Sequence, residues 1–166
     1  MELKKFFLSQ FNIKNLICLI IILIIFSFDR VTKLKIIEIQ MNDRPLLINE
    51  YINLDLVWNT GIGFGLLSSN NNIVYNLISA LILAVIIFLF YLIIRSKMID
   101  KILLSLILGG ALGNVYDRLT YFAVPDFIDI HYKNFHWFTF NIAYIFITIG
   151  ILVFIMKDLF LKDEKN

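Results

Sequence analysis

Polar side chains interrupt the apolar runs of this chain at four places. In chain order the groups are Asp29 with Thr32 and Lys33, Asn59 with Thr60, Asn114 with Asp117 and Arg118, and Asp126 with Asn141. An aspartate can take up or release a proton during a reaction, and an amide can hold it by a hydrogen bond. Ionisable groups at membrane depth are costly and usually face protein or a water-filled cavity. The four groups therefore predict one polar site within an apolar protein.

Helical spacing indicates that two of these groups meet. Gly110, Asn114 and Asp117 follow one another at i, i+4 and i+7, so they share a helix face. A second face begins at Asn141 and includes Tyr144. We expect these two faces to meet at one end of the molecule.

Each carboxylate also has a simpler interpretation. Asp117 beside Arg118, and Asp29 beside Arg30, would ordinarily form ion pairs at helix ends. Asp126 would be an ordinary loop carboxylate after a proline. The gathering of all four groups near one surface favours a functional site over these separate explanations.

The elements that position the groups are long apolar segments. Of the 166 residues, 60% are hydrophobic and 17% are charged, and the mean hydropathy is +0.82. A helix needs about 20 apolar residues to cross a hydrocarbon layer. The sequence predicts an all-α membrane protein, a single domain over residues 1–166, with four transmembrane helices at about 15–35, 73–94, 99–117 and 138–157. A cleaved signal peptide is a weaker interpretation of the first run, because no small-x-small cleavage site follows it.

The distribution of charge predicts the orientation. Lys4, Lys5 and Lys14 precede the first helix, and the loop over 95–101 is also basic. Since Lys and Arg favour the cytoplasmic side, we expect both termini in the cytoplasm and the polar site near the outer face. Residues 31–72 are expected to form short strands or an amphipathic platform at that face. The net charge of +2 gives no indication of a nucleic-acid partner.

No metal or cofactor is expected. Cys18, the single cysteine, lies within the first apolar run and is interpreted as a buried hydrophobic residue. His131 and His136, with Tyr132 and Trp137, are interpreted as an aromatic belt at the membrane interface. A zinc site would need three or four suitably spaced ligands.

Five sequence blocks point to a family. They are DRVTK (29–33), WNTGIGFGLL (58–67), GGALGNVYDRL (109–119), VPDFIDIHY (124–132) and FNIAYIFITIG (140–150). In order and spacing they resemble the motifs of lipoprotein signal peptidase, also called signal peptidase II or prolipoprotein signal peptidase. The resemblance covers essentially the whole chain.

The resemblance implies an aspartyl protease of the bacterial inner (cytoplasmic) membrane. Its fold would have four helices and a small extracytoplasmic β-cradle between the first two. Its partners would be membrane lipids and diacylglyceryl-modified prolipoproteins, which it would cut just before the lipidated cysteine. By motif, Asp126 matches one catalytic aspartate and Tyr144 stands at the position of the second. The residues implied to bind substrate or support the site are Asp29, Asn59, Gly110, Asn114, Asp117, Arg118 and Asn141.

Tyr144 is the departure from the family pattern. In an aspartic dyad one ionised carboxylate draws a proton from water while its protonated partner polarises the scissile carbonyl. The fourth-helix motif of the family ends Phe-Asn-x-Ala-Asp, whereas this chain reads FNIAY. A phenol can donate a hydrogen bond to a carbonyl but exchanges protons poorly near neutral pH. We therefore expect strongly reduced cleavage.

Three explanations of Tyr144 stay open at this point. The chain is a natural or engineered variant that binds without cutting, the sequence contains an error, or Asp129 supplies the second carboxylate. In an extended segment Asp129 would point away from the face of Asp126, which argues against the last explanation.

Two other functions are alternatives to cleavage. A non-catalytic binder of lipoprotein signal peptides would share the fold and differ at position 144. A small polytopic transporter would use Asp29 and Asp117 along a polar path. The transporter is disfavoured because the polar groups cluster near one surface and the chain lacks the inverted repeat that many transporters show.

Overall fold

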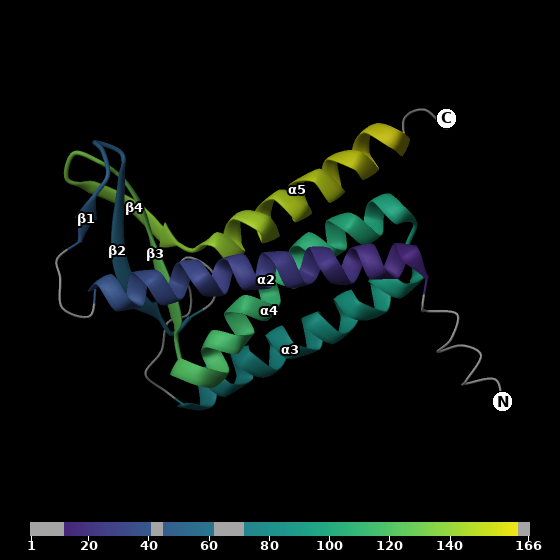
Figure 1. Ribbon diagram of the computed structural model, residues 1–166, viewed down its shortest axis with the longest axis horizontal. Helices are drawn as coiled ribbons and strands as arrows, with labels where there is room; N and C mark the ends of the chain where they lie inside the picture. The colour runs from purple at the N-terminus through teal and green to yellow at the C-terminus, as the bar shows by residue number, and fades with distance from the viewer. Residues whose placement is uncertain (1–11, 41–44, 62–71, 163–166) are drawn as a thin grey trace.

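The fold is a helical bundle with a small sheet at one end (Figure 1). The computed structural model describes residues 12–40, 45–61 and 72–162. The element order is α2 (Ile13–Gln40), β1 (Leu46–Leu47), β2 (Ile52–Asn59), α3 (Asn72–Arg95), α4 (Met98–Tyr121), β3 (Val124–Tyr132), β4 (Phe135–Phe140) and α5 (Ile142–Lys162).

Each of the four helices is long and apolar enough to cross a membrane. Large apolar side chains such as Leu77, Leu81 and Phe88 of α3 point away from the protein and are exposed. A smaller set lies between α2, α3 and α4 and includes Cys18 and Leu108, both almost fully buried. An apolar exterior around a thin apolar core suits lipid as the solvent. The predicted four-helix membrane fold is confirmed.

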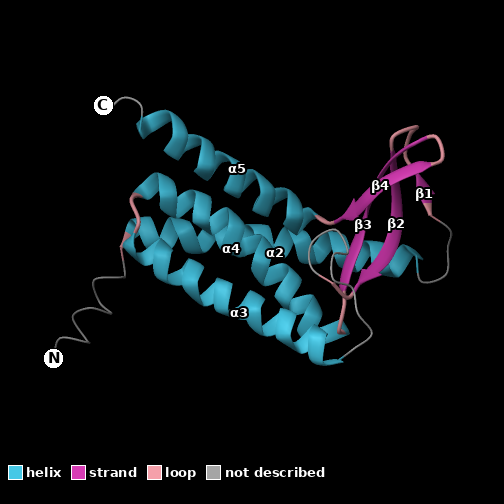
Figure 2. Cartoon of the chain, turned by 180° about the vertical axis from the view of Figure 1, so that it is seen from behind, coloured by secondary structure: helices cyan, strands magenta, loops and turns pink. Residues whose placement is uncertain are grey.

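The ends of the helices alternate between two ends of the bundle. The start of α2, the turn between α3 and α4 and the end of α5 lie together, far from the sheet (Figure 1). The other helix ends face the sheet, as the reverse view also shows (Figure 2). The residues that lie next to the sheet therefore come from the end of α2, the end of α4 and the start of α5.

The sheet is antiparallel with the order β1-β2-β3-β4. The expected cradle between the first two helices supplies only half of it, because β3 and β4 lie between α4 and α5. The predicted start of the fourth helix at 138 was wrong for the same reason. Residues 135–140, FHWFTF, are rich in aromatic side chains that favour strands, and α5 begins only at Ile142.

Short connections join the sheet to the helices. Helix α4 ends at Tyr121, Phe122 adopts a left-handed conformation with φ 56°, and β3 begins at Val124. A single residue separates β4 from α5. At the other edge, α2 extends beyond its predicted end at 35 to Gln40. The Gln40 amide donates to the Leu54 carbonyl at 2.6 Å and accepts from the Leu56 N–H at 2.5 Å, where the β2–β3 register is irregular.

Two glycines let α4 approach its neighbours closely. A Cβ at Gly109 would lie 2.9 Å from Cβ of Ile25, and one at Gly110 would lie 2.6 Å from the Ala143 carbonyl oxygen. Small residues at such contacts let membrane helices pack backbone to backbone. Gly110 therefore fixes the distance between α4 and the first turn of α5.

Candidate active site

Asp126 lies on β3 and is almost completely buried, with 2% of its surface exposed. The strand register pairs Asn59 with Val124 and Val57 with Asp126, so Asn59 is a diagonal neighbour of Asp126 on one face of the sheet. The Asn59 amide donates to Oδ2 of Asp126 at 2.8 Å. The Asn141 amide donates to Oδ1 at 2.6 Å. Two neutral amides thus hold the two oxygens of one buried carboxylate.

Burial raises the pKa of Asp126 from 3.8 to about 6. The hydrogen bonds from Asn59 and Asn141 and the positive charges of Lys33 and Arg118 act in the opposite direction and only partly offset the loss of hydration. A group with this pKa can both accept and release a proton near neutral pH, which is the requirement for general acid–base catalysis.

Asn141 connects this carboxylate to α5. It immediately precedes the first residue of the helix, and its Oδ1 accepts the N–H of Tyr144 at 3.3 Å, so it is the N-cap. Its amide nitrogen donates to Asn114 Oδ1 at 3.1 Å as well as to Asp126. One side chain therefore links β3, α4 and the start of α5.

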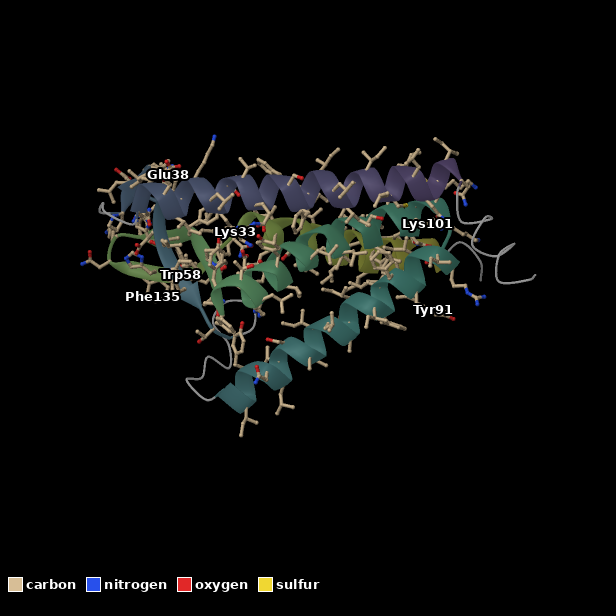
Figure 3. All side chains as sticks on the ribbon, turned by 60° about the horizontal axis from the view of Figure 1, so that its bottom comes forward. Lys33, Glu38, Trp58, Tyr91, Lys101 and Phe135 are labelled. Carbon is tan, nitrogen blue, oxygen red and sulfur yellow. The ribbon has the colours of Figure 1, made fainter. Side chains whose placement is uncertain are left out.

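A network of charged side chains adjoins these amides and is linked to them through Asn114. Lys33 points inward from α2 toward the other helices (Figure 3). Its ammonium donates to Asp29 Oδ2 at 2.7 Å, Asp117 Oδ2 at 2.6 Å and Asn114 Oδ1 at 2.8 Å. The other oxygen of Asp117 pairs with Arg30, whose guanidinium also lies 4.6 Å from the ring centre of Tyr116. Two carboxylates and two cations are thus buried together.

Asp29 joins this network to α5. Its Oδ1 accepts the N–H of Ala143, one of the N-terminal amides of α5 that has no partner within the helix, at 3.0 Å. Gly113 of α4 provides the room, because a Cβ there would collide with the Asp29 carboxylate. Glycine at position 113 therefore makes room on α4 for a buried charge of α2.

The ion pair expected between Asp117 and Arg118 is absent from the described residues. Instead, Arg118 donates to the carbonyl oxygens of Gly61 at 2.7 Å and Asn114 at 3.2 Å. Gly61 in turn donates its N–H to Asn59 Oδ1 at 2.8 Å. The alternative interpretation of these two residues as a simple ion pair does not hold, because successive helix residues point about 100° apart and the two side chains face different neighbours.

Tyr144 lies on the first turn of α5, partly buried. Its phenol interacts with the Arg118 side chain and lies near enough to Asp126 to feel the charge of the ionised carboxylate. The side chain at position 144 therefore belongs to the same cluster as Asp126, as the helical spacing predicts.

The structure brings the predicted site residues into one region. Asp126, Asn59, Asn141 and Asn114 form a continuous chain of hydrogen bonds. Lys33 was named in the first polar group but was given no role at the site, although its i+4 spacing from Asp29 in an apolar helix was a usable signal. Residues 62–67 of the glycine-rich motif lie outside the described residues.

Asp129 does not approach Asp126. It accepts a hydrogen bond at 2.7 Å between its Oδ2 and Nδ1 of His136, and it faces away from the catalytic cluster along β3. A carboxylate three residues further along a strand points to the other face. This placement gives no support to Asp129 as the missing second carboxylate.

Comparison with known proteins identifies the family. The model for "Signal peptidase (SPase) II" matches residues 21–160. The chain is 44% identical to the lipoprotein signal peptidase of Pelagibacter ubique (strain HTCC1062), covering 96% of this chain and 98% of that protein. It is 38% identical to the lipoprotein signal peptidase of Anaplasma phagocytophilum (strain HZ), covering 92% and 98%. This chain belongs to the signal peptidase II family.

The solved structures agree. A bacterial membrane enzyme determined by the in meso method at 2.3 Å superposes with a TM-score of 0.77 at 29% identity, covering 90% of this chain and 91% of the other. A second, at 1.9 Å, has a TM-score of 0.70 at 29% identity, covering 86% and 92%. Family membership makes this protein an aspartic peptidase by descent and supports that function over the transporter and the binder.

Proposed function

We propose that this signal peptidase II homologue cuts diacylglyceryl-modified prolipoproteins before the lipidated cysteine, with Asp126 as the proton-transferring carboxylate. The observation that carries the proposal is the buried Asp126 carboxyl, held by two amides, with its pKa raised to about 6. A general base is most effective when its pKa lies near the working pH, because it is then largely ionised and still basic enough to take a proton from water.

The steps of amide hydrolysis can be assigned to these residues. Ionised Asp126 takes a proton from water as the water oxygen attacks the scissile carbonyl carbon. The protonated Asp126 then gives this proton to the leaving nitrogen as the C–N bond breaks. Asn59 and Asn141 keep the carboxyl oriented through both transfers. One carboxylate is therefore enough to carry the proton from water to the leaving nitrogen. A second group must donate a hydrogen bond to the carbonyl oxygen as negative charge develops on it.

We assign that donor role to Tyr144. Its phenol lies in the cluster of Asp126 and Arg118 and can donate a hydrogen bond to a carbonyl. It does not return a proton as readily as a carboxylic acid, because an ordinary phenol has a pKa of about 10. We therefore expect cleavage to be much slower than that of the same protein with aspartate at 144.

The test is cleavage of a diacylglyceryl prolipoprotein by the purified chain in lipid, beside Tyr144→Asp and Tyr144→Phe. Restoring the second carboxylate is expected to raise the rate by a factor of about 10² to 10⁴. Tyr144→Phe keeps the ring and removes the hydroxyl, so it should be slower than the parent. Equal rates for all three would refute the role of position 144. Binding without cleavage by the parent, with cleavage by Tyr144→Asp, would identify the parent as a binder.

We place the site at the outer face of the bacterial inner membrane, with both termini in the cytoplasm. Basic residues before α2 and in the α3–α4 turn support this orientation. The grouping of the start of α2, the α3–α4 turn and the end of α5 at the end opposite the sheet is consistent with it (Figure 1). Fusions after residue 166 would test this orientation, since each reporter is active on one side of the membrane only. A fluorescent protein fused there should be active, and a periplasmic phosphatase should be inactive.

A further inference from the structure

A second cluster of polar side chains lies on the β3–β4 hairpin. Asp129 and His131 alternate with Ile130 along β3, so they share one face of the strand, and His136 of β4 is the cross-strand partner of His131. One ligand atom from each of the three side chains lies within 4.8 Å of the others. Asp129 and His131 are buried, with 4% and 8% of their surfaces exposed. None of the three contributes to the hydrogen bonds that hold Asp126.

Hydrogen bonding accounts for only part of this cluster. The 2.7 Å contact between His136 Nδ1 and Asp129 Oδ2 is an ordinary hydrogen bond. His131 Nδ1 is different, because it is buried and has no hydrogen-bond partner in the described ranges. It faces the same carboxylate oxygen at 3.7 Å, which is too long for a hydrogen bond. Buried polar atoms in native structures nearly always have a partner, so this nitrogen needs one.

We propose that Asp129, His131 and His136 bind a divalent zinc-type cation. Two imidazoles and one carboxylate are ligands that zinc prefers, and three protein ligands leave further positions to water. Zinc bonds to nitrogen and oxygen of about 2.1 Å place two ligand atoms roughly 3.4 Å apart in a tetrahedral site. The 3.7 Å separation between His131 and Asp129 is close to this value.

Binding requires one adjustment. The 2.7 Å separation of His136 Nδ1 and Asp129 Oδ2 is shorter than the distance of roughly 3.4 Å between two ligand atoms of a tetrahedral zinc site, so it must lengthen. The His136 side chain is 55% exposed, so it can rotate without disturbing a packed core. The sequence indicates only two ligands, His131 and His136, because the pairing of β3 with β4 is what brings Asp129 beside both histidines.

The ion has a structural use at this position. The β3–β4 register is irregular between Ile130 and His131, where the ladder of backbone hydrogen bonds is weakened. An ion held by Asp129 and His131 of β3 and by His136 of β4 would join the strands at this point. The inference goes beyond the peptidase function, and no catalytic step passes through the ion.

Composition makes the site unusually easy to test. The whole chain contains two histidines, both in this cluster, and its one cysteine is Cys18, buried in α2. Zinc binding through nitrogen ligands by the untagged protein must therefore involve His131 or His136. An oligohistidine tag has to be removed first, because it would bind zinc itself.

The experiment is competition for zinc between a chromogenic chelator and the tag-free protein in detergent. His136→Ala and Asp129→Asn are compared with Asn134→Ala, a change at an exposed position in the same hairpin. The parent and Asn134→Ala should each bind one ion. The two ligand variants should bind at least about ten-fold more weakly, since losing even an outer-shell partner of a metal site costs that much.

Thermal unfolding provides an independent readout. Zinc should raise the unfolding temperature of the parent and of Asn134→Ala but not of His136→Ala, and magnesium should not replace it. Without zinc, His136→Ala should unfold at a lower temperature than the parent, because its hydrogen bond to Asp129 is lost. The readout is therefore the shift in unfolding temperature that zinc produces within each protein, which separates loss of binding from loss of stability. A parent that binds no zinc, or a His136→Ala protein that binds it equally well, would overturn the proposal.

Discussion

Asp117 and Asp126 are both buried aspartates at the same end of the bundle, yet their surroundings are opposite. Asp117 is paired with the ammonium of Lys33 and the guanidinium of Arg30. Asp126 is held by two neutral amides, those of Asn59 and Asn141, and by no cation directly. Ion pairs hold a carboxylate between its cations, whereas neutral amides orient a carboxyl group without adding any charge beside it. The comparison separates the carboxylates that hold the helices together from the one that can react.

The largest expected effect is on catalysis at the amide-held carboxyl. Asp126→Asn keeps the size and polarity of the side chain but cannot accept a proton from water. Cleavage should fall by a factor of about 10² to 10⁴, measured as initial rates on prolipoprotein in the Tyr144→Asp background, where rates are easier to measure. Asp55→Asn, the same change on the neighbouring strand β2, is the matched control and should retain its rate. Similar losses in both variants would mean that Asp126 has no special role.

The charge-paired region should respond in stability. Lys33→Met leaves Asp29 and Asp117 buried without their shared cation, at a cost of about 3–5 kcal/mol in unfolding free energy. Denaturation by SDS in mixed micelles would measure this cost. Lys35→Met, at an exposed position on the same helix, should change little. If both variants unfold alike, the network does not stabilise the bundle.

Asn141 belongs to the amide-held region but also caps α5, and Asn12 caps α2 at the other end of the bundle. Asn12 Oδ1 accepts the N–H of Asn15 at 3.0 Å at the start of α2. Asn12→Ala should cost about 1 kcal/mol. Asn141→Ala should cost roughly 3 kcal/mol, because the bonds to Asp126 and Asn114 are lost as well. It should also raise the pKa of Asp126, since a donor to the ionised carboxylate is removed. Equal losses of unfolding free energy in the two variants would mean that Asn141 acts only as a helix cap.

The pH dependence of the parent tests the assignment of Asp126 without any substitution. Protonation of Asp126 removes the base, so cleavage should fall about ten-fold per pH unit below a midpoint near 6. Stability should change in the opposite direction. Because the folded pKa is raised, the stabilisation from this group is complete below pH 3.8 and is lost, by roughly 3 kcal/mol, as pH rises through about 6. Asp126→Asn should lack this component, and a flat rate profile between pH 5 and 7 would contradict the assignment.

The sequence was sufficient to predict four long apolar helices and to name residues that the structure brings together at one end of the bundle. Uncharged runs of helical length have few other solutions in a membrane protein, and the five motifs named nearly every residue of the cluster. The partners of those residues could not be predicted. Lys33 and Asp117 are 84 residues apart in the chain, and β2 and β3 pair across a similar separation.

Local sequence was misleading at two positions for physical reasons. Asp117 and Arg118 are adjacent, yet helix geometry turns their side chains to different partners. Residues 138–140 continue smoothly in hydropathy into α5, but their pairing with Ile128, Asp129 and Ile130 makes them a strand. Hydropathy indicates burial in lipid or protein and does not distinguish a buried strand from a membrane-spanning helix.

The tightness of the connections around the hairpin has a mechanical consequence. The chain passes from α4 to β3 through two residues and from β4 to α5 through one, so neither joint has slack to absorb movement. A change in the angle between α4 and α5 therefore moves β3 and β4 relative to each other. Asp126 lies just beyond the first connection, and Asn141 is the second. The angle between these two lipid-embedded helices therefore sets the length of the 2.6 Å hydrogen bond from Asn141 to Asp126.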